Sequence, residues 1–206
     1  MESFIERYQK ICREAGLTKE HMAKLLDMSV TGVEAIETGY IEPNEKILLR
    51  LSDIFNVSAG YMATLTDDPK CEEEYNAKEV YILSSLWGDN GIITIKDIVG
   101  TAFVNRNETK GKDYCALVMK DDSMVKSRIY KDDVLIVKRQ AAASNGEVVV
   151  VLVEDEELVR RYHRKGNYIT LSAEGDSFKY KTIKIDETET KFKILGKVCE
   201  VRIKNI

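Results

Sequence analysis

Apolar side chains recur at helical spacing through the first 65 residues of the chain. Phe4, Ile5, Tyr8, Ile11 and Cys12 share one face of a predicted helix that ends at Ala15-Gly16. Four more helices are predicted from a capping residue and an apolar face: Thr18 before Met22, Ala23, Leu25 and Leu26; Ser29 before Val33 and Ile36, with Gly39 at the end; Pro43-Asn44 before Ile47, Leu48, Leu51 and Ile54; and Ser58 before Tyr61, Met62 and Leu65. Residues 1–65 are therefore expected to form an all-α domain of five helices.

The pattern changes after residue 65. Residues 66–75 are polar and acidic and contain Pro69, a composition typical of a linker. The apolar positions of 77–87 favour a helix, so that 66–91 is predicted to be a linker carrying one helix. From 92 to 206 short β-branched runs separated by Gly, Asn and Asp predict a mostly-β domain, a bent antiparallel sheet or partly open barrel with strands at 92–95, 114–119, 134–137, 147–153, 168–171 and 192–201. The fold class is thus α + β in two domains.

Residues 17–65 resemble the XRE/Cro family of helix-turn-helix repressors. Residues 18–26 (TKEHMAKLL) match that family's second helix, and residues 27–39 (DMSVTGVEAIETG) match its turn, recognition helix and final glycine. The resemblance implies that the third helix enters the major groove of DNA with its N-terminal residues at base edges. The residues implied to contact bases are Ser29, Val30, Thr31, Glu34 and Ala35, and those implied to reach the phosphate backbone are Lys19, Tyr40, Asn44 and Lys46.

Charge runs against this expectation. The chain carries a formal net charge of −4, and residues 1–65 hold seven basic and ten acidic side chains. No Lys or Arg lies between Asp27 and Glu42, although phosphate neutralisation supplies most sequence-independent DNA affinity. Glu34 can accept a hydrogen bond from cytosine, yet it also repels phosphate. A helix-turn-helix kept as a protein-interaction surface, with weak or no DNA binding, is therefore an alternative.

Residues from about 98 onward resemble the LexA/UmuD-type serine peptidase domain of phage repressors. The matching segments, in family order, are 120–124 (KDDSM), 129–137 (IYKDDVLIV), 145–151 (NGEVVVV), 171–176 (LSAEGD) and 194–198 (ILGKV). The resemblance makes Ser123 the counterpart of a serine nucleophile, which self-cleaving members activate with a neutral lysine. In this chain the base position holds Arg160, and a guanidinium stays protonated under protein conditions.

The expected substrate is also missing. Self-cleaving relatives carry an Ala-Gly or Cys-Gly bond shortly after a Val-Gly segment, whereas Val99-Gly100 is followed by the bond Ala102-Phe103. We therefore expect no active enzyme, and we expect the Ser123 hydroxyl to be satisfied by local hydrogen bonds, with Arg160 near it. A self-cleaving repressor that uses Ser123 with an unusual base is the enzymatic alternative.

The domain resemblances imply a transcriptional regulator that acts as a homodimer, paired through its C-terminal domain, on a palindromic double-stranded DNA operator. Its release would use an antirepressor protein, a separate protease or a small signal, among which the sequence does not choose. No cofactor or metal is expected, because Cys12, Cys71, Cys115 and Cys199 lie far apart and His21 and His163 form no cluster. No signal peptide or membrane span is expected either, and the predicted location is the cytoplasm.

Overall fold

The computed structural model describes residues 2–69, 77–88, 91–105, 109, 112–176, 178–186 and 190–203. The chain divides into two compact units, one made of Met1–Tyr81 and Ile92–Asn105 and the other of Ile82–Gly91 and Arg106–Ile206. Residues 70–75 of the predicted acidic linker segment, 66–75, lie outside the described residues. Each unit is therefore considered by itself.

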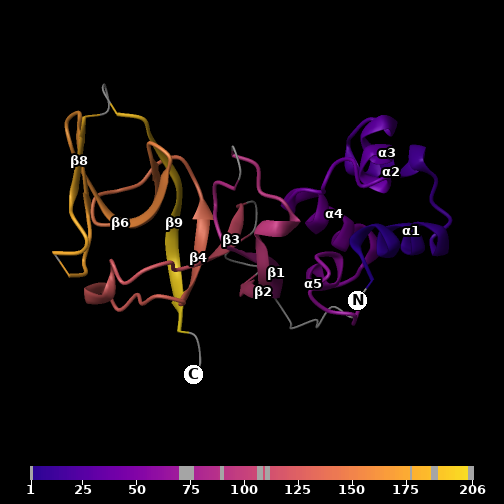
Figure 1. Ribbon diagram of the computed structural model, residues 1–206, viewed down its shortest axis with the longest axis horizontal. Coiled ribbons are helices and arrows are strands. Elements are labelled where there is room, and N and C mark those ends of the chain that lie inside the picture. The colour runs from indigo at the N-terminus through magenta and orange to yellow at the C-terminus, as the bar shows by residue number, and fades with distance from the viewer. Residues whose placement is uncertain are drawn as a thin grey trace. The chain divides into compact units, whose positions relative to one another are not determined.

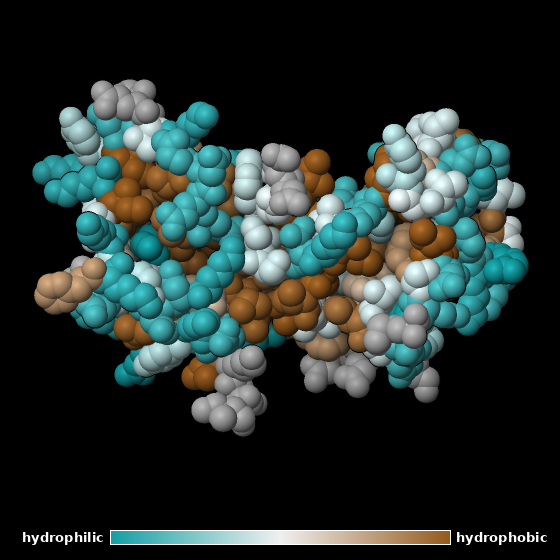
Figure 2. Space-filling model, viewed as in Figure 1, coloured by the Kyte–Doolittle hydropathy of each residue, from teal (hydrophilic) through white to brown (hydrophobic). Residues whose placement is uncertain are grey.

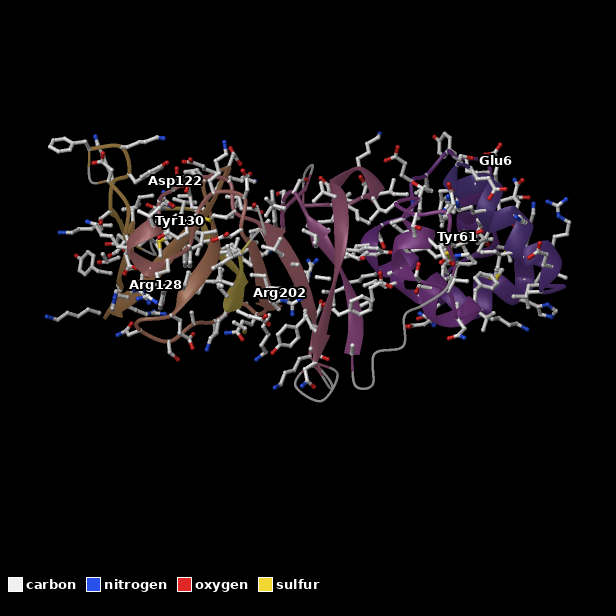
Figure 3. The ribbon with its side chains drawn as sticks, turned by 90° about the horizontal axis from the view of Figure 1, so that it is seen from below. Glu6, Tyr61, Asp122, Arg128, Tyr130 and Arg202 are labelled. Carbon is white, nitrogen blue, oxygen red and sulfur yellow. The ribbon has the colours of Figure 1, made fainter. Side chains whose placement is uncertain are left out.

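The first unit holds the five helices, drawn from indigo to purple in Figure 1. They are α1 (Phe4–Glu14), α2 (Lys19–Leu26), α3 (Val30–Glu37), α4 (Glu45–Phe55) and α5 (Ala59–Met62). The predicted caps are confirmed, because the side-chain oxygens of Thr18, Ser29, Asn44 and Ser58 each accept a hydrogen bond from a backbone N–H in the first turn that follows. Glu6 of α1 completes a further capping box with Ser3 (Figure 3).

The helical core contains a buried arginine. Arg7 has no exposed surface, and its Nη1 donates to the carbonyl oxygens of Tyr61 at 2.7 Å and Thr66 at 2.5 Å. Its Nη2 pairs with Asp67 at 2.5 Å, and the guanidinium lies over the Tyr61 ring. Because Nη1 and Nη2 find these partners, the segment directly after α5 packs against α1 rather than extending as a free linker, although Arg7 Nε has no partner among the described residues.

The helix expected over 77–87 is wrong. Strand β1 spans Ala77–Leu83 instead. In a strand, residues two apart share a face, and that spacing brings both Glu79 and Tyr81 to α5: the Glu79 carboxylate accepts from the Ala59 N–H at 2.7 Å, and the Tyr81 hydroxyl donates to the Ala59 carbonyl at 2.9 Å. A helix would turn these two side chains away from each other. Ile82 and Leu83 pair in parallel with β3.

The strand expected at 92–95 is also wrong. The Thr94 N–H donates to the Asp97 carboxylate at 2.8 Å, which favours a turn, and Ile95–Asp97 form a 3₁₀ helix. Thr94 keeps only an isolated bridge to Asn44. The strand of this region is β2 (Ile98–Asn105), which the sequence pattern did not predict.

The second unit is built on strands β3 (Tyr114–Val118), β4 (Val134–Arg139), β5 (Val148–Val153), β6 (Glu156–Lys165), β7 (Tyr168–Ser172), β8 (Ile183–Asp186) and β9 (Phe192–Arg202). With β1 and β2, the described strands form one sheet in the order β2-β1-β3-β4-β9-β5-β6-β7-β8. β2 and β8 end the order without pairing with each other, so the sheet is not closed, as expected. β6 and β8 were not predicted. β6 curves strongly along its length (Figure 1).

The core of the curved region consists of the inward residues of β5, β6, β7, β8 and β9, namely Val149, Val151, Leu158, Tyr162, Ile169, Leu171, Ile185 and Ile194. Gly196 on β9 lies against β4, where a Cβ would meet the Val137 side chain at 2.5 Å and the Lys138 carbonyl oxygen at 2.7 Å. A side chain at this position would therefore separate the two strands. On the visible face hydrophilic side chains cover much of the surface, with apolar groups between them (Figure 2). Within the described residues, no helix is long and apolar enough to span a bilayer.

Candidate functional site

The turn between α2 and α3 fixes the start of the predicted recognition helix. Asp27 ends α2 in the left-handed region at φ 57°. Ser29 then caps α3 by accepting from the Gly32 N–H at 3.1 Å. A Cβ on Gly32 would lie 2.9 Å from the end of the Met28 side chain and 3.3 Å from the Ser29 hydroxyl oxygen. The glycine, which weakens a helix by itself, thus lets Met28 and the cap pack closely against the first turn.

The exposed face of α3 carries the predicted base-contacting residues. Val33 and Ile36 are buried beneath it. Ser29, Val30, Thr31 and Glu34 are exposed, and Ala35 is half-buried. The hydroxyls of Ser29 and Thr31 lie 3.0 Å apart and share a hydrogen bond. The first turn therefore presents hydroxyl and methyl groups, with one carboxylate behind them.

Lys19, predicted to contact phosphate, is held by the acidic side chains of α3. Its Nζ lies 2.8 Å from the Glu34 carboxylate and 3.5 Å from that of Glu37. The hydrogen bond with Glu34 raises the pKa of Lys19. The lysine therefore stays charged, but Glu34 and Glu37 partly neutralise it before any phosphate arrives.

The other residues predicted to contact phosphate differ in their exposure and in the hydrogen bonds they already make. Tyr40 is 88% exposed, and Lys46 is exposed on the first turn of α4. Asn44 already uses its side-chain oxygen to cap α4, accepting from the Ile47 N–H at 3.0 Å. Only its amide nitrogen is left over by this bond.

In the second unit the structure brings Ser123 and Arg160 together. Ser123 lies in the turn after β3, and Arg160 lies on β6. The Arg160 Nη1 donates to the Ser123 hydroxyl oxygen at 2.7 Å. Both side chains are buried, with relative exposures of 5% for Arg160 and 0% for Ser123. Two residues that are 37 positions apart thus form one enclosed contact.

The chemistry of this contact differs from that of a serine–lysine pair. Burial lowers the pKa of Arg160, and the negative charge of Asp121 acts in the opposite direction. Because the ordinary pKa of an arginine lies far above neutral pH, Arg160 remains a cation, and a guanidinium cation has no lone pair to accept the serine proton. Arg160 Nη1 also donates to the Val159 carbonyl at 2.7 Å, while its Nε has no partner among the described residues. The serine hydroxyl thus accepts a hydrogen bond from a buried cation.

The turn that carries Ser123 is fixed on its other side by the segment after β7. The Glu174 N–H donates to the Ser123 carbonyl at 2.7 Å. Gly175 permits this approach, since a Cβ there would meet the Asp122 carbonyl oxygen at 2.5 Å. Asp122 and Tyr130 lie near each other on this end of the unit (Figure 3). The Asp122 carboxylate accepts from the Lys131 N–H at 3.1 Å.

The neighbouring arginine, Arg161, has a different role that the sequence pattern did not reveal. Successive residues of a strand point to opposite faces, so only one of the two arginines can face Ser123. Arg161 makes a two-pronged ion pair with Glu174, at 2.5 and 2.9 Å, and its Nη2 and Nη1 donate to Ser127 and to the Gly146 carbonyl. Glu174 also contacts the Ser127 hydroxyl. The hydrogen bond from Arg161 lowers the pKa of Glu174.

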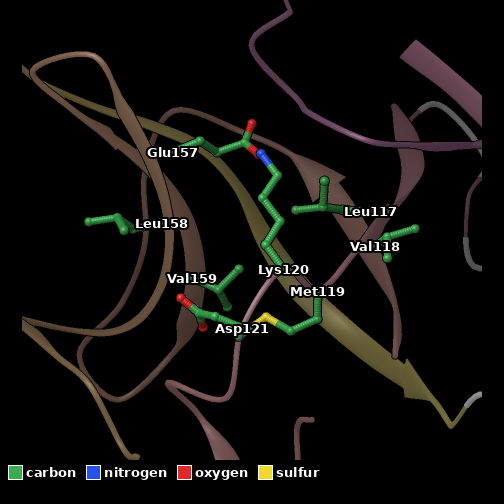
Figure 4. A pocket seen from close by; sticks show the side chains of 8 residues that line it. All are labelled: Leu117, Val118, Met119, Lys120, Asp121, Glu157, Leu158 and Val159. Atoms are coloured by element: carbon green, nitrogen blue, oxygen red, sulfur yellow. The ribbon is translucent and has the colours of Figure 1, made fainter. Parts of the chain in front are cut away.

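A small pocket adjoins the site, between the end of β3 and the start of β6. Leu117, Val118, Met119, Lys120, Asp121, Glu157, Leu158 and Val159 line it. Figure 4 shows Lys120 extending toward Glu157, and the two charged groups lie 3.0 Å apart. The other Glu157 oxygen accepts from the N–H groups of Leu86 at 2.6 Å and Trp87 at 3.1 Å. The turn after β1 is thus anchored beside the pocket by a carboxylate that sequence reasoning did not identify.

The segment compared with the cleavage site of self-cleaving relatives is part of a regular strand. The bond Ala102-Phe103 lies within β2, and Ala102 is 9% exposed. No group of three or more His, Cys, Asp or Glu side chains that could hold a metal ion is found in the part of the chain that the structure describes.

Two family models match the chain. One, described as Peptidase S24-like, covers residues 56–199, and the other, described as Helix-turn-helix, covers residues 9–62. Both resemblances drawn from the sequence are thereby confirmed, in the predicted order along the chain. The two-part α + β organisation is confirmed with them.

Proposed function

The chain belongs to the Peptidase S24-like family, and we propose that it is a sequence-specific DNA-binding transcriptional regulator that does not cleave itself. The helix-turn-helix match supports the DNA-binding part. The hydrogen bond from Arg160 to Ser123 carries the second part, because it occupies the serine with a group that cannot act as a base.

The geometry of α2 and α3 favours DNA over a protein partner. The cap at Ser29 leaves the first turn of α3 exposed, and this is the part of a recognition helix that reaches base edges. Val30 and Thr31 offer methyl groups suited to thymine, and Glu34 offers an acceptor suited to the amino group of cytosine. Sequence-specific contact thus remains available to a helix without Lys or Arg.

We further propose that the protein acts in the cytoplasm as a homodimer joined through the second unit, on a palindromic operator. A single helix-turn-helix with a neutralised Lys19 makes few phosphate contacts, so that two linked copies are needed for useful affinity. Release is proposed to use an antirepressor protein, a separate protease or a small signal.

Selection of bound duplexes from a random pool with the full-length protein tests DNA recognition. We expect an enriched palindrome whose half-sites lie about one helical turn apart. Thr31→Ala should change the selected bases, whereas Lys46→Gln should weaken binding to all sequences about equally. Lys24→Gln, an exposed lysine of α2 outside the predicted contacts, is the matched control. A pool without an enriched sequence would favour the interaction-module alternative, for which a pulldown would then seek the partner.

Incubation of the purified protein at alkaline pH, followed by mass spectrometry, tests the absence of self-cleavage. We expect a single intact mass for the wild-type protein and for Ser123→Ala. Two fragments from the wild type that vanish in Ser123→Ala would establish the enzymatic alternative. Fragments that persist in Ser123→Ala would come from a contaminating protease and would not support it.

A further inference from the structure

A second cavity lies in the β-rich unit, lined by the start of β3, the end of β4, the loop before β5 and the middle of β9. Its volume is about 500 Å³, within the range of pockets that hold small organic ligands. Its lining residues are Lys112, Tyr114, Lys138, Gln140, Ala142, Ala143, Ser144, Glu147, Lys197 and Cys199. None of them belongs to the Ser123 and Arg160 contact.

The strand register places the basic groups of this cavity side by side. Lys138 on β4 is directly opposite Tyr114 on β3 and directly opposite Lys197 on β9. Residues directly opposite one another share a face, with Cβ atoms about 5 Å apart. Two lysines in that relation repel each other, which destabilises the sheet unless a negative charge lies between them.

The cavity itself contains only part of that negative charge. Glu147 pairs with Lys197 at 2.5 Å, and its other oxygen accepts from the Ser144 N–H at 2.8 Å, which holds the carboxylate at one side. This pairing lowers the pKa of Glu147 and raises that of Lys197, so both groups are charged. Lys138 has no ion pair within the described residues. Lys138 and Lys197 against Glu147 leave a formal charge of +1 on these three lining groups.

The residue types narrow the chemistry of the ligand. An arginine fork binds carboxylate or phosphate through two fixed, parallel hydrogen bonds, whereas the compact ammonium of lysine binds a phosphate as a point charge. No arginine lines the cavity among the described residues, and Ala142 and Ala143 leave room beside the lysines for an uncharged portion of a ligand. We propose that this cavity is a binding site for a small phosphorylated molecule whose phosphate contacts Lys138 and Lys197.

Ligand binding at this site would let a small molecule regulate the protein without peptide cleavage. The proposal of the site does not depend on DNA binding by the chain. It is therefore tested without DNA, by titrating full-length ¹⁵N-labelled protein with glycerol 3-phosphate and with sodium pyrophosphate at constant ionic strength. We expect saturable shifts at the backbone amides of Lys138, Ser144 and Lys197. Shifts confined to other residues, or no saturable shift at millimolar ligand, would overturn the proposal.

Variants then locate the contact. Lys138→Gln and Lys197→Gln should each weaken binding about tenfold or more, because each removes a charged hydrogen-bond donor. Glu147→Gln should tighten binding, because it removes a competing carboxylate and keeps an acceptor for Ser144. Lys184→Gln, at an exposed position on β8, is the matched control and should leave affinity unchanged.

Thermal melting of the same variants separates a lost contact from a lost fold. Lys138→Gln removes a like-charge repulsion, so its thermal midpoint without ligand should equal or exceed that of the wild type, and a loss of binding cannot then be assigned to unfolding. Equal affinity in wild type and Lys138→Gln would overturn the proposal. Displacement of glycerol 3-phosphate by a short DNA duplex would also overturn it, because the lysines would then be a nucleic-acid contact instead.

Discussion

The stability of a Ser123→Ala variant tests whether Ser123 stabilises the fold or has a catalytic role. The hydroxyl accepts a hydrogen bond from the buried Arg160 guanidinium at 2.7 Å, and neither side chain has much contact with solvent. Ser123→Ala removes the acceptor and leaves the cation in place. In an enzyme, by contrast, removal of a catalytic group from a strained site commonly increases stability.

The size of the effect follows from what Arg160 retains. A hydrogen bond that involves a charged group contributes about 1.5–3 kcal/mol. Arg160 Nη1 keeps its bond to the Val159 carbonyl, so we take the lower end, about 1.5 kcal/mol. For a chain of this size that loss lowers the thermal midpoint by roughly 3–6 °C.

The assay uses the single tryptophan of the chain, Trp87, which lies in the same unit as Ser123. Its fluorescence during urea unfolding of wild type, Ser123→Ala and the exposed control Ser144→Ala gives the three free energies of unfolding. In an Arg160→Met background the cost of Ser123→Ala should fall by half or more, since the donor is gone. An unchanged or increased stability of Ser123→Ala, or no coupling to Arg160→Met, would refute the structural role of the pair.

Four further results are expected. Arg7→Met should lower the free energy of unfolding of the helical unit by about 3 kcal/mol or more, measured by circular dichroism, because it strands the buried carbonyl partners of the guanidinium and removes its ion pair. Ser29→Ala should cost about 1 kcal/mol of stability and weaken operator binding in an anisotropy titration, since the cap orders the first turn of α3. Glu34→Gln should leave Lys19 with only its longer contact to Glu37, so that it can contact phosphate and steepen the salt dependence of non-specific DNA binding by up to about one phosphate equivalent; an unchanged slope would contradict this. The lowered pKa of Glu174 predicts stability that is complete above its ordinary value of 4.5 and lost as the pH falls through the lower folded value; urea midpoints across that range should show the loss in wild type and less of it in Glu174→Gln.

The helical half could be predicted well because its signals are local. The bonds from the Thr18, Ser29, Asn44 and Ser58 side chains reach only three residues ahead, so sequence spacing is enough to identify them. The segment 77–83 fails for the opposite reason. Its apolar positions suit a helix or a strand, and the choice is made by a bond from Glu79 to a residue 20 positions away.

In the candidate site, only the residues that match family motifs could be predicted from the sequence. The resemblance pairs Ser123 with Arg160 because it fixes both positions, and the structure places them in contact. The resemblance did not predict two other contacts: the ion pair between Arg161 and Glu174, and the hydrogen bond from the Leu86 N–H to the Glu157 carboxylate. Both depend on which face of β6 each side chain occupies, and β6 itself follows a turn where Glu154 takes a positive φ of 53°, without the glycine that usually marks such a turn.

If the proposed function is right, the arginine at position 160 and the acidic recognition helix have a functional connection. With an arginine at position 160 the chain is proposed not to cut the link between the helix-turn-helix and the unit that pairs two copies. An antirepressor protein or a small signal would then act by changing a binding or pairing equilibrium, and such couplings are typically limited to about 1–3 kcal/mol. A recognition helix whose nearest lysine is already neutralised by Glu34 makes so modest a coupling sufficient, because its hold on DNA depends on the gain of about 10²–10⁴ that comes from linking two weak sites. A strongly basic helix would stay bound through its phosphate contacts after the pair was disturbed, whereas this acidic one is expected to leave.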